Sequence, residues 1–241
     1  MQISREERMA VAAARRLTVY TTCFVGIGVP SIAAMLCKRI YEPNLNLIYE
    51  SGVIGANPAL PPLSTGSPSV ARGADMVGKM VDVFGALQAG RIEVGILSGA
   101  QVDIHGNLNS TVIGSFDNPV LRLPGSGGAL DIALLVRNLM ILMPHEPRRL
   151  VGKVDFITSP GRSDAPRSRS GPRTDTLVTD KATFRFVRDG VELVAHYEDV
   201  DPEKLGVFHN VRTPVAGPEI IPLPTARELE TLKTFLGGDN E

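Results

Sequence analysis

The sequence predicts an α/β fold, an open and mostly parallel β-sheet flanked by helices. The β-branched and aromatic run Thr18–Val25 ends at a glycine turn, apolar residues at helical spacing follow Pro30, and Leu45–Tyr49 forms a second β-type run. A strand, a helix and a strand in this order make a unit whose two strands are parallel neighbours. Val94–Leu97 and Leu139–Met143 have similar composition and extend the predicted sheet.

The first helix has a clear start signal. Ser4 followed three residues later by Glu7 is a capping-box pattern, and the apolar residues after it predict a helix that runs to about Leu17. Further along, the segment Val70–Ala89 has helical character. These helices are expected to cover the faces of the sheet.

The C-terminal part begins with a segment over 159–173 that is rich in Pro, Gly, Ser and Arg, which predicts an irregular loop. Its four arginines could meet phosphates of a nucleotide-like ligand, although a solvated or partner-facing loop is the favoured interpretation. Asp189-Gly190 between two alternating apolar runs predicts a β-hairpin. A helix over about 225–236, capped by Thr225 and Glu228, closes the chain.

Composition restricts the function classes. The 241 residues are 43% hydrophobic, which is enough for one sizeable core, so we expect a single domain over 1–241. The 25 basic and 26 acidic residues nearly cancel, which argues against nucleic acid or an anionic membrane surface as partner and favours a small ligand. Charges of both signs near the amino end and short apolar runs predict neither a signal peptide nor a membrane span, and hence a cytoplasmic protein. The two cysteines are expected to be buried free thiols, and we expect no metal site.

Four small-residue segments fall where a parallel sheet has its functional edge. In open α/β sheets ligands bind outside the carboxyl ends of the strands, so these segments could converge on one crevice. They are Gly26-Ile27-Gly28, Glu50-Ser51-Gly52, Ser98-Gly99-Ala100-Gln101 and Gly125-Ser126-Gly127-Gly128-Ala129.

The first segment is not a dinucleotide-binding fingerprint, because Pro30 stands where the third glycine would be needed. Gly26 and Gly28 could let a ligand approach the backbone, and a tight strand-to-helix turn is the favoured alternative.

Glu50 is the candidate nucleophile. It follows the buried run Leu47–Tyr49 and precedes Ser51, Gly52 and the apolar Val53–Ile54, so its carboxylate leaves a strand into a small-residue, apolar loop. A poorly hydrated carboxylate is a stronger nucleophile and general base than a hydrated one, and Gly52 leaves room for a thioester carbon. Pattern alone favours the alternative, an ordinary glutamate at the rim of a sheet.

Gly125–Ala129 supplies consecutive backbone N–H groups without bulky side chains, and such a turn can form an oxyanion site; a glycine-rich connection without a ligand is the alternative. Side-chain amides can orient a thioester or a carboxylate without adding charge. The candidates for this role are Gln101, Asn107 and Asn109. His105 and His145 lie near the same motifs, and we expect structural roles for both.

At these residues the sequence resembles the beta chain of class I coenzyme A transferases, and within that family most resembles the B subunit of glutaconate CoA-transferase. The resemblance covers most of the chain, in a fixed order of long motifs. They are VGIGVP (25–30), KRIYEPNLNLIYESG (38–52), SGAQVDIHGNLNSTVIG (98–114), GSGGA (125–129), HEPRRLVGKVDFITSPG (145–161) and LVTDKATFRF (177–186).

The resemblance implies a ping-pong transfer of CoA from an acyl-CoA to a small carboxylic acid, through a glutamyl-CoA thioester on Glu50. It also implies backbone oxyanion donors around Gly127, Gly128 and Ala129, and substrate or CoA contacts from Ser51 and Gly52. A different, alpha subunit is implied as partner, and CoA enters as a substrate with no permanently bound cofactor.

Two alternatives stay open. A hydrolase of CoA thioesters, including one that cleaves ring-derived carbon–carbon bonds, could use the same fold, and a non-catalytic subunit could only stabilise its partner. The intact Glu-Ser-Gly motif argues against both. The loop after Glu50 (VIGANPALPPL) differs from the glutaconate enzyme, so the acyl group is not predicted.

Overall fold

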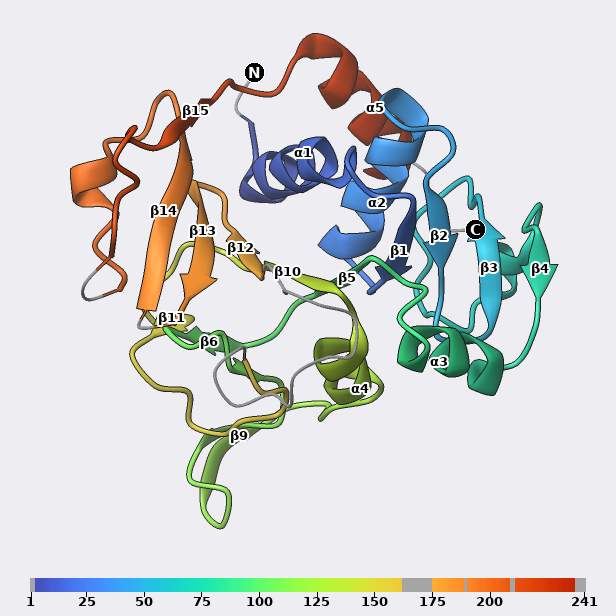
Figure 1. Cartoon of the computed structure of the whole chain (residues 1–241), viewed down its shortest axis with the longest axis horizontal. Helices are drawn as coiled ribbons and strands as arrows, with labels where there is room; N and C mark the ends of the chain where they lie inside the picture. The colour runs from blue at the N-terminus through green and yellow to red at the C-terminus, as the bar shows by residue number, and fades with distance from the viewer. Residues whose placement is uncertain (1–2, 162–174, 189, 209–210, 237–241) are drawn as a thin grey trace.

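The computed structural model describes residues 3–161, 175–188, 190–208 and 211–236. Its centre is a ten-stranded mixed sheet that runs across the molecule (Figure 1). In spatial order the strands are β15 (Glu219–Ile221), β14 (Gly190–Tyr197), β13 (Ala182–Val187), β12 (Thr176–Val178), β10 (Asn138–Leu142), β5 (Val94–Leu97), β1 (Thr22–Val25), β2 (Asn46–Ile48), β3 (Val53–Ala56) and β4 (Met76–Val77).

The five central strands, from β12 to β2, are parallel, and the strands next to them on both sides pair antiparallel. The predicted parallel pair is present, with Cys23 opposite Leu47. The open, mostly parallel sheet confirms the α/β prediction. A three-stranded sheet and a two-stranded sheet complete the β-structure: β11 (Leu150–Val151), β6 (Gln101–Asp103) and β7 (Leu108–Asn109); and β8 (Val112–Gly114) with β9 (Pro119–Arg122).

Helices cover both faces of the large sheet (Figure 1). One face is covered by α1 (Arg5–Leu17), α2 (Val29–Ile40) and α5 (Ala226–Leu236), and the other by α3 (Met80–Gln88) and α4 (Ala129–Leu135). Short 3-10 turns are η1 (Pro68–Ala71) and η2 (Pro202–Lys204).

Alternation along the strands divides the core into two layers. In β1, Cys23 and Val25 pack with α1 and α2, whereas Phe24 between them points to the α3 and α4 side. Successive strand residues point to opposite faces, and burial of both faces explains the continuous apolar runs. Among the described residues, no helix is both long and apolar enough to span a bilayer.

The local signals at both ends of the chain are confirmed. Ser4 Oγ accepts the N–H of Glu7 at 3.2 Å, and the Glu7 carboxylate accepts the N–H of Ser4 at 2.7 Å. Thr225 and Glu228 make the same reciprocal pair at the start of α5. The predicted hairpin is formed by β13 and β14, with Asp189 itself outside the described residues. Most of the predicted loop, residues 162–173, also lies outside them.

Two predicted elements have different bounds. The first strand starts only at Thr22, because Thr18 still has helical dihedrals and the N–H of Tyr20 donates to the Leu17 carbonyl. The segment predicted to be helical, Val70–Ala89, is instead the end of η1, strand β4 and helix α3. Gly73 has a φ of +70°, which no continuous helix accommodates.

Candidate active site at the carboxyl ends of the central strands

Glu50 occupies a tight turn at the carboxyl end of β2. The N–H of Tyr49 donates to the Val53 carbonyl at 2.9 Å, and the N–H of Gly52 donates to the Tyr49 carbonyl at 3.1 Å. This turn reverses the chain from β2 into the antiparallel β3. Glu50 and Ser51 are therefore presented at its tip, where both are half-buried.

The carboxylate of Glu50 lies against Gly128, which precedes the first turn of α4. A Cβ atom built on Gly128 would lie 2.9 Å from Glu50 Oε1 and 3.0 Å from Glu50 Cδ. The same atom would lie 2.8 Å from Cζ of Phe84. Only a residue without a side chain lets the carboxylate come this close to the α4 turn.

In the glycine-rich segment Gly125–Ala129, the first residue is fixed by hydrogen bonds, whereas two later N–H groups make none within the described residues. The N–H of Gly125 donates to the Ser110 carbonyl at 2.8 Å, and Ser110 Oγ donates back to the Gly125 carbonyl at 2.9 Å. The N–H of Ala129 donates to the Ser126 carbonyl at 2.9 Å. The N–H groups of Gly127 and Gly128 donate to no acceptor among the described residues.

Of the three predicted oxyanion donors, Ala129 is thus engaged inside the turn. The N–H groups of Gly127 and Gly128 stay unused among the described residues, and Gly128 lies next to the Glu50 carboxylate.

Gly52 joins the Glu50 turn to the start of α3. Its carbonyl accepts the N–H of Gly78 at 2.9 Å, and a Cβ on Gly52 would lie 2.5 Å from the Gly78 carbonyl oxygen. Its φ is +108°, a conformation that side chains disfavour. Beside it, the buried Oγ of Ser51 has no hydrogen-bond partner among the described residues. The Ser51 hydroxyl is thus an unused polar group in the residue that follows Glu50.

Gly26 and Gly28 lie at the end of β1, one strand away. A Cβ on Gly26 would lie 2.8 Å from the Ile96 carbonyl oxygen of β5, and Ser31 Oγ donates to the Gly26 carbonyl at 2.7 Å. Gly28 has a φ of +80° and precedes the first turn of α2. Both glycines therefore serve the strand-to-helix turn, and their contact with substrate stays a prediction.

Gln101 and Asn109 belong to a separate network in the three-stranded sheet. Gln101 Oε1 accepts from Asn109 Nδ2 at 2.8 Å and from the N–H of Asp155 at 3.0 Å, and Gln101 Nε2 donates to Asp155 Oδ2 at 3.1 Å. Asn109 Nδ2 also donates to the Val112 carbonyl at 2.7 Å. These amides hold the strand that leads into Ser110, which in turn holds Gly125.

Asn107 is engaged in a neighbouring turn. Its Nδ2 donates to Asp103 Oδ2 at 3.0 Å, and its Oδ1 accepts the N–H of Gly161 at 2.7 Å. His105 is exposed in the same turn, and its N–H donates to Asp103 Oδ1 at 3.0 Å. All three predicted amides thus have protein partners, and a role in contacting substrate stays a prediction.

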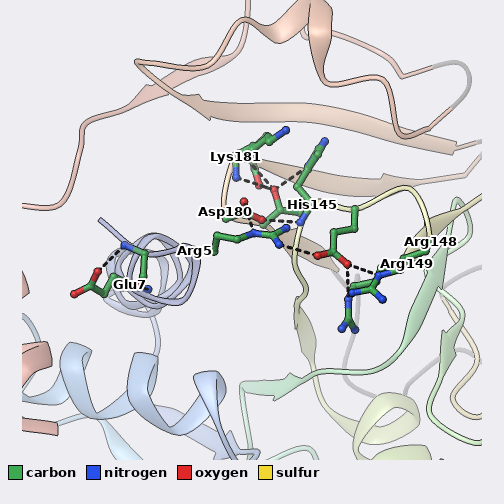
Figure 2. A network of polar contacts seen from close by, with 11 residues as sticks. Arg5, Glu7, His145, Arg148, Arg149, Asp180 and Lys181 are labelled. Carbon is green, nitrogen blue, oxygen red and sulfur yellow. Dashed lines mark hydrogen bonds and ion pairs between the residues drawn. The ribbon is translucent and has the colours of Figure 1, made fainter. Parts of the chain in front are cut away.

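His145 is buried in a polar cluster just beyond the carboxyl end of β10. Figure 2 shows His145, Asp180 and Arg5 meeting there: Asp180 Oδ1 accepts the N–H of His145 at 2.6 Å, and Asp180 Oδ2 accepts from Arg5 Nε at 3.1 Å. The imidazole contacts the Leu205 carbonyl through Nε2 at 2.9 Å and Thr179 Oγ1 through Nδ1 at 3.1 Å. Burial lowers the pKa of this imidazole. These contacts support a structural role.

The Glu146 carboxylate forms salt bridges with three arginines, Arg5, Arg148 and Arg149, which Figure 2 labels. Hydrogen bonds from Arg148 first, and from Arg5 and Arg149, bring the pKa of Glu146 to about 2. Arg149 also reaches the carbonyl of Gly99 at 3.4 Å. The cluster therefore ties the segment after β5 to the first helix.

No group of three or more His, Cys, Asp or Glu side chains in the described part of the chain could hold a metal ion. Cys23 and Cys37 are buried and unpaired, as predicted. Burial raises the pKa of the Cys23 thiol, and it raises the pKa of Cys37 to about 12.

The tertiary structure thus brings Glu50, Ser51, Gly52, Gly127 and Gly128 together, with Gly26 and Gly28 one strand away. It adds Phe84, which the sequence indicated only as an apolar residue of a helical segment. Such a pattern tells which residues face a core and not which of them also borders a carboxylate.

Three comparisons with known proteins identify the family. The model of the family described as "Coenzyme A transferase" matches residues 6–204. The chain is 49% identical to the B subunit of 3-oxoadipate CoA-transferase from Pseudomonas knackmussii over 162 residues, which cover 67% of this chain and 62% of the relative. It is 35% identical to the B subunit of glutaconate CoA-transferase from Acidaminococcus fermentans over 214 residues, 83% of this chain and 80% of the relative.

The crystal structure of glutaconate coenzyme A-transferase from Acidaminococcus fermentans superposes with a TM-score of 0.84 and 30% identity, covering 95% of this chain and 93% of that one. The family match, the two B-subunit relatives and the shared fold lead to one conclusion: the chain belongs to the coenzyme A transferase family, among its B subunits.

Proposed function

We propose that this chain is the nucleophile-bearing subunit of a two-subunit enzyme that transfers CoA from an acyl-CoA to a carboxylic acid. The observation that carries the proposal is the contact between the Glu50 carboxylate and Gly128, in a turn where the N–H groups of Gly127 and Gly128 have no acceptor among the described residues. A carboxylate nucleophile and donors for an oxyanion are the two elements that acyl transfer needs at one place.

In the first half-reaction, a Glu50 carboxylate oxygen attacks the thioester carbonyl carbon, the carbon–sulfur bond breaks and CoA leaves as thiolate. The thiolate then attacks Cδ of Glu50, the anhydride carbon–oxygen bond breaks, and the acyl group leaves as a free carboxylate. The product is a glutamyl-CoA thioester, which preserves the thioester bond energy.

In the second half-reaction, the acceptor carboxylate attacks Cδ of Glu50 and releases CoA thiolate. The thiolate attacks the acyl carbon of the new anhydride, forming the product acyl-CoA and restoring the Glu50 carboxylate. Each tetrahedral intermediate carries an oxyanion, and the N–H groups of Gly127 and Gly128 are the proposed donors to it. CoA is a substrate in this scheme, and a side-chain carboxylate carries the covalent chemistry.

The proposed partner is a different, alpha subunit, since the relatives are named as B subunits and such a name implies a second kind of chain. Exposed apolar side chains on both sides of Gly78 support a partner surface at this place. They lie next to the Glu50 turn, because Gly78 contacts Gly52 of that turn. They are Met76, Val77, Met80 and Val81. We expect the isolated chain to be inactive and to co-purify with the alpha subunit when the two are expressed together; a fully active homomer would contradict this.

The deciding experiment treats the complex of the two chains with acyl-CoA and measures the mass of the peptide that contains Glu50. We expect one CoA per site on Glu50 of the unaltered enzyme, lost on addition of an acceptor acid. Glu50→Ala and Glu50→Asp should lose transfer by several orders of magnitude, on the order of 10³-fold or more, while folding normally. Glu230→Gln, which changes an exposed carboxylate on α5, is the matched control.

Two outcomes separate the alternatives. CoA release without an acceptor acid would indicate a hydrolase, and an unchanged rate in Glu50→Ala would indicate a non-catalytic subunit. A substrate screen should include 3-oxoadipate and glutaconate, the acids named in the relatives, together with acetate.

A further inference from the structure

Phe84 borders the catalytic turn without belonging to any of its motifs. It lies in the second turn of α3 and is half-buried. One side of its ring packs edge-on against Phe24 of β1, with centroids 5.9 Å apart and planes at 61°. Such a pair fixes the orientation of a ring more firmly than general apolar packing does.

The tip of the Phe84 ring and the Glu50 carboxylate both approach one point above Gly128. A single Cβ position on Gly128 would be 2.8 Å from Phe84 Cζ and 2.9 Å from Glu50 Oε1. The ring tip and the carboxylate oxygen therefore share the small space above the Cα of Gly128. The ring tip therefore limits how far the carboxylate can move across Gly128, because packed atoms do not interpenetrate.

The position of this ring is coupled to the turn that carries Glu50. The hydrogen bond from Gly78 to Gly52 joins that turn to the chain just before α3. The next residue, Lys79, precedes the first turn of α3, and its N–H donates to the Asp82 carboxylate at 2.8 Å. The turn that carries Glu50 and the helix that carries Phe84 are thus joined through the hydrogen bond between Gly78 and Gly52.

A glutamate side chain has several rotatable bonds, and freezing them lowers its entropy. A nucleophile displaced by about 1 Å can lose on the order of 10²-fold in rate, so confinement of the carboxylate has kinetic value. We infer that Phe84 is a positioning residue for the transfer reaction: its ring tip confines the Glu50 carboxylate against Gly128. This inference rests on the proposed function of Glu50.

The test uses Phe84→Ala and Phe84→Leu in the complex with the alpha subunit. It measures the single-turnover rate of CoA-thioester formation on Glu50, counted per site that becomes labelled, together with KM for acyl-CoA. We expect Phe84→Ala to lower the rate about tenfold or more with KM changed by less than about threefold. Phe84→Leu, which restores most of the apolar volume, should recover part of the rate.

Phe24→Leu is the matched control, because it removes the same ring pair through the residue that is not among the nearest neighbours of a Cβ on Gly128. Phe24→Leu and Phe84→Leu should lower the melting temperature similarly, but Phe24→Leu leaves the Phe84 ring tip over Gly128 and should lower the rate per labelled site much less than Phe84→Ala does. An unchanged rate in Phe84→Ala, or an equal loss in Phe24→Leu, would overturn the positioning role alone. Failure of the unaltered complex to place CoA on Glu50 would overturn the proposed function and this inference with it.

Discussion

The Oε1 atom of Glu50 lies 2.9 Å from the position that a methyl group on Gly128 would occupy. Glu50 follows β2, the second strand of a βαβ unit, whereas Gly128 precedes α4, far along the chain. Their contact puts the carboxylate against the turn in which the N–H groups of Gly127 and Gly128 have no acceptor among the described residues. It also makes the residue at 128 sterically critical.

Gly128→Ala should therefore reduce CoA transfer by about 10²-fold, because the added methyl displaces the carboxylate or the turn that carries the proposed oxyanion donors. Turnover of the two-subunit complex and its melting temperature are the measurements. Gly152→Ala is the control, since nothing lies within 4 Å of a Cβ there. Full activity in Gly128→Ala would show that the contact with Glu50 is not needed.

Gly52→Ala should both destabilise the protein and impair transfer. The new methyl would lie 2.5 Å from the Gly78 carbonyl oxygen, at a φ of +108°. We expect a loss of about 2 kcal/mol or more in the free energy of unfolding, measured in urea. Gly73→Ala separates the two causes, because Gly73 has a φ of +70° but open space around it. Equal losses in the two variants would mean that backbone strain alone explains the effect.

Glu228 is a buried carboxylate that joins α5 to α1 and α2. It accepts two hydrogen bonds from Arg15 at 2.8 Å each, one from Tyr41, and one from Thr225 Oγ1 at 2.7 Å. Glu228→Ala leaves Arg15 without its carboxylate partner and should lower the free energy of unfolding by about 3 kcal/mol, while the rate per folded site stays unchanged. Urea unfolding checks this against Glu230→Ala, an exposed change on the same helix.

His145 should make stability depend on pH. Burial, the largest cause, lowers the pKa of its imidazole below the ordinary value of 6.5. As the pH falls below 6.5, the unfolded chain therefore takes up a proton that the folded protein refuses, and the contribution of His145 to stability is lost. Above that pH the contribution is fully present.

The measurement is the urea midpoint between pH 7.5 and 5. The unaltered protein should lose stability more steeply towards pH 5 than His145→Gln, by no more than about 1.4 kcal/mol per pH unit for one proton. His105→Gln serves as the surface control. Parallel curves for the unaltered protein and His145→Gln would contradict a coupling between this imidazole and folding.

Much of the fold could be predicted because its signals are local. The capping boxes at Ser4 and Thr225 and the glycine turn after β1 each depend on residues a few positions apart. The error over Val70–Ala89 has the same origin, since apolar residues at helical spacing occur there by chance across Gly73 and Gly78. Local patterns do not reveal where the chain turns away from a helix.

The sequence by itself determined the α/β class, the parallel strand pair that ends at Glu50, and the motifs that resemble those of coenzyme A transferases. Only the tertiary structure decided that the Glu50 carboxylate contacts Gly128 and that Phe84 borders the same space above Gly128. It also decided that the side-chain amides of Gln101 and Asn109 form a hydrogen bond with each other. The physical reason is that periodicity and turn chemistry act between near neighbours in the chain. Contacts between distant segments depend on how whole helices and strands pack, which no short stretch of sequence specifies.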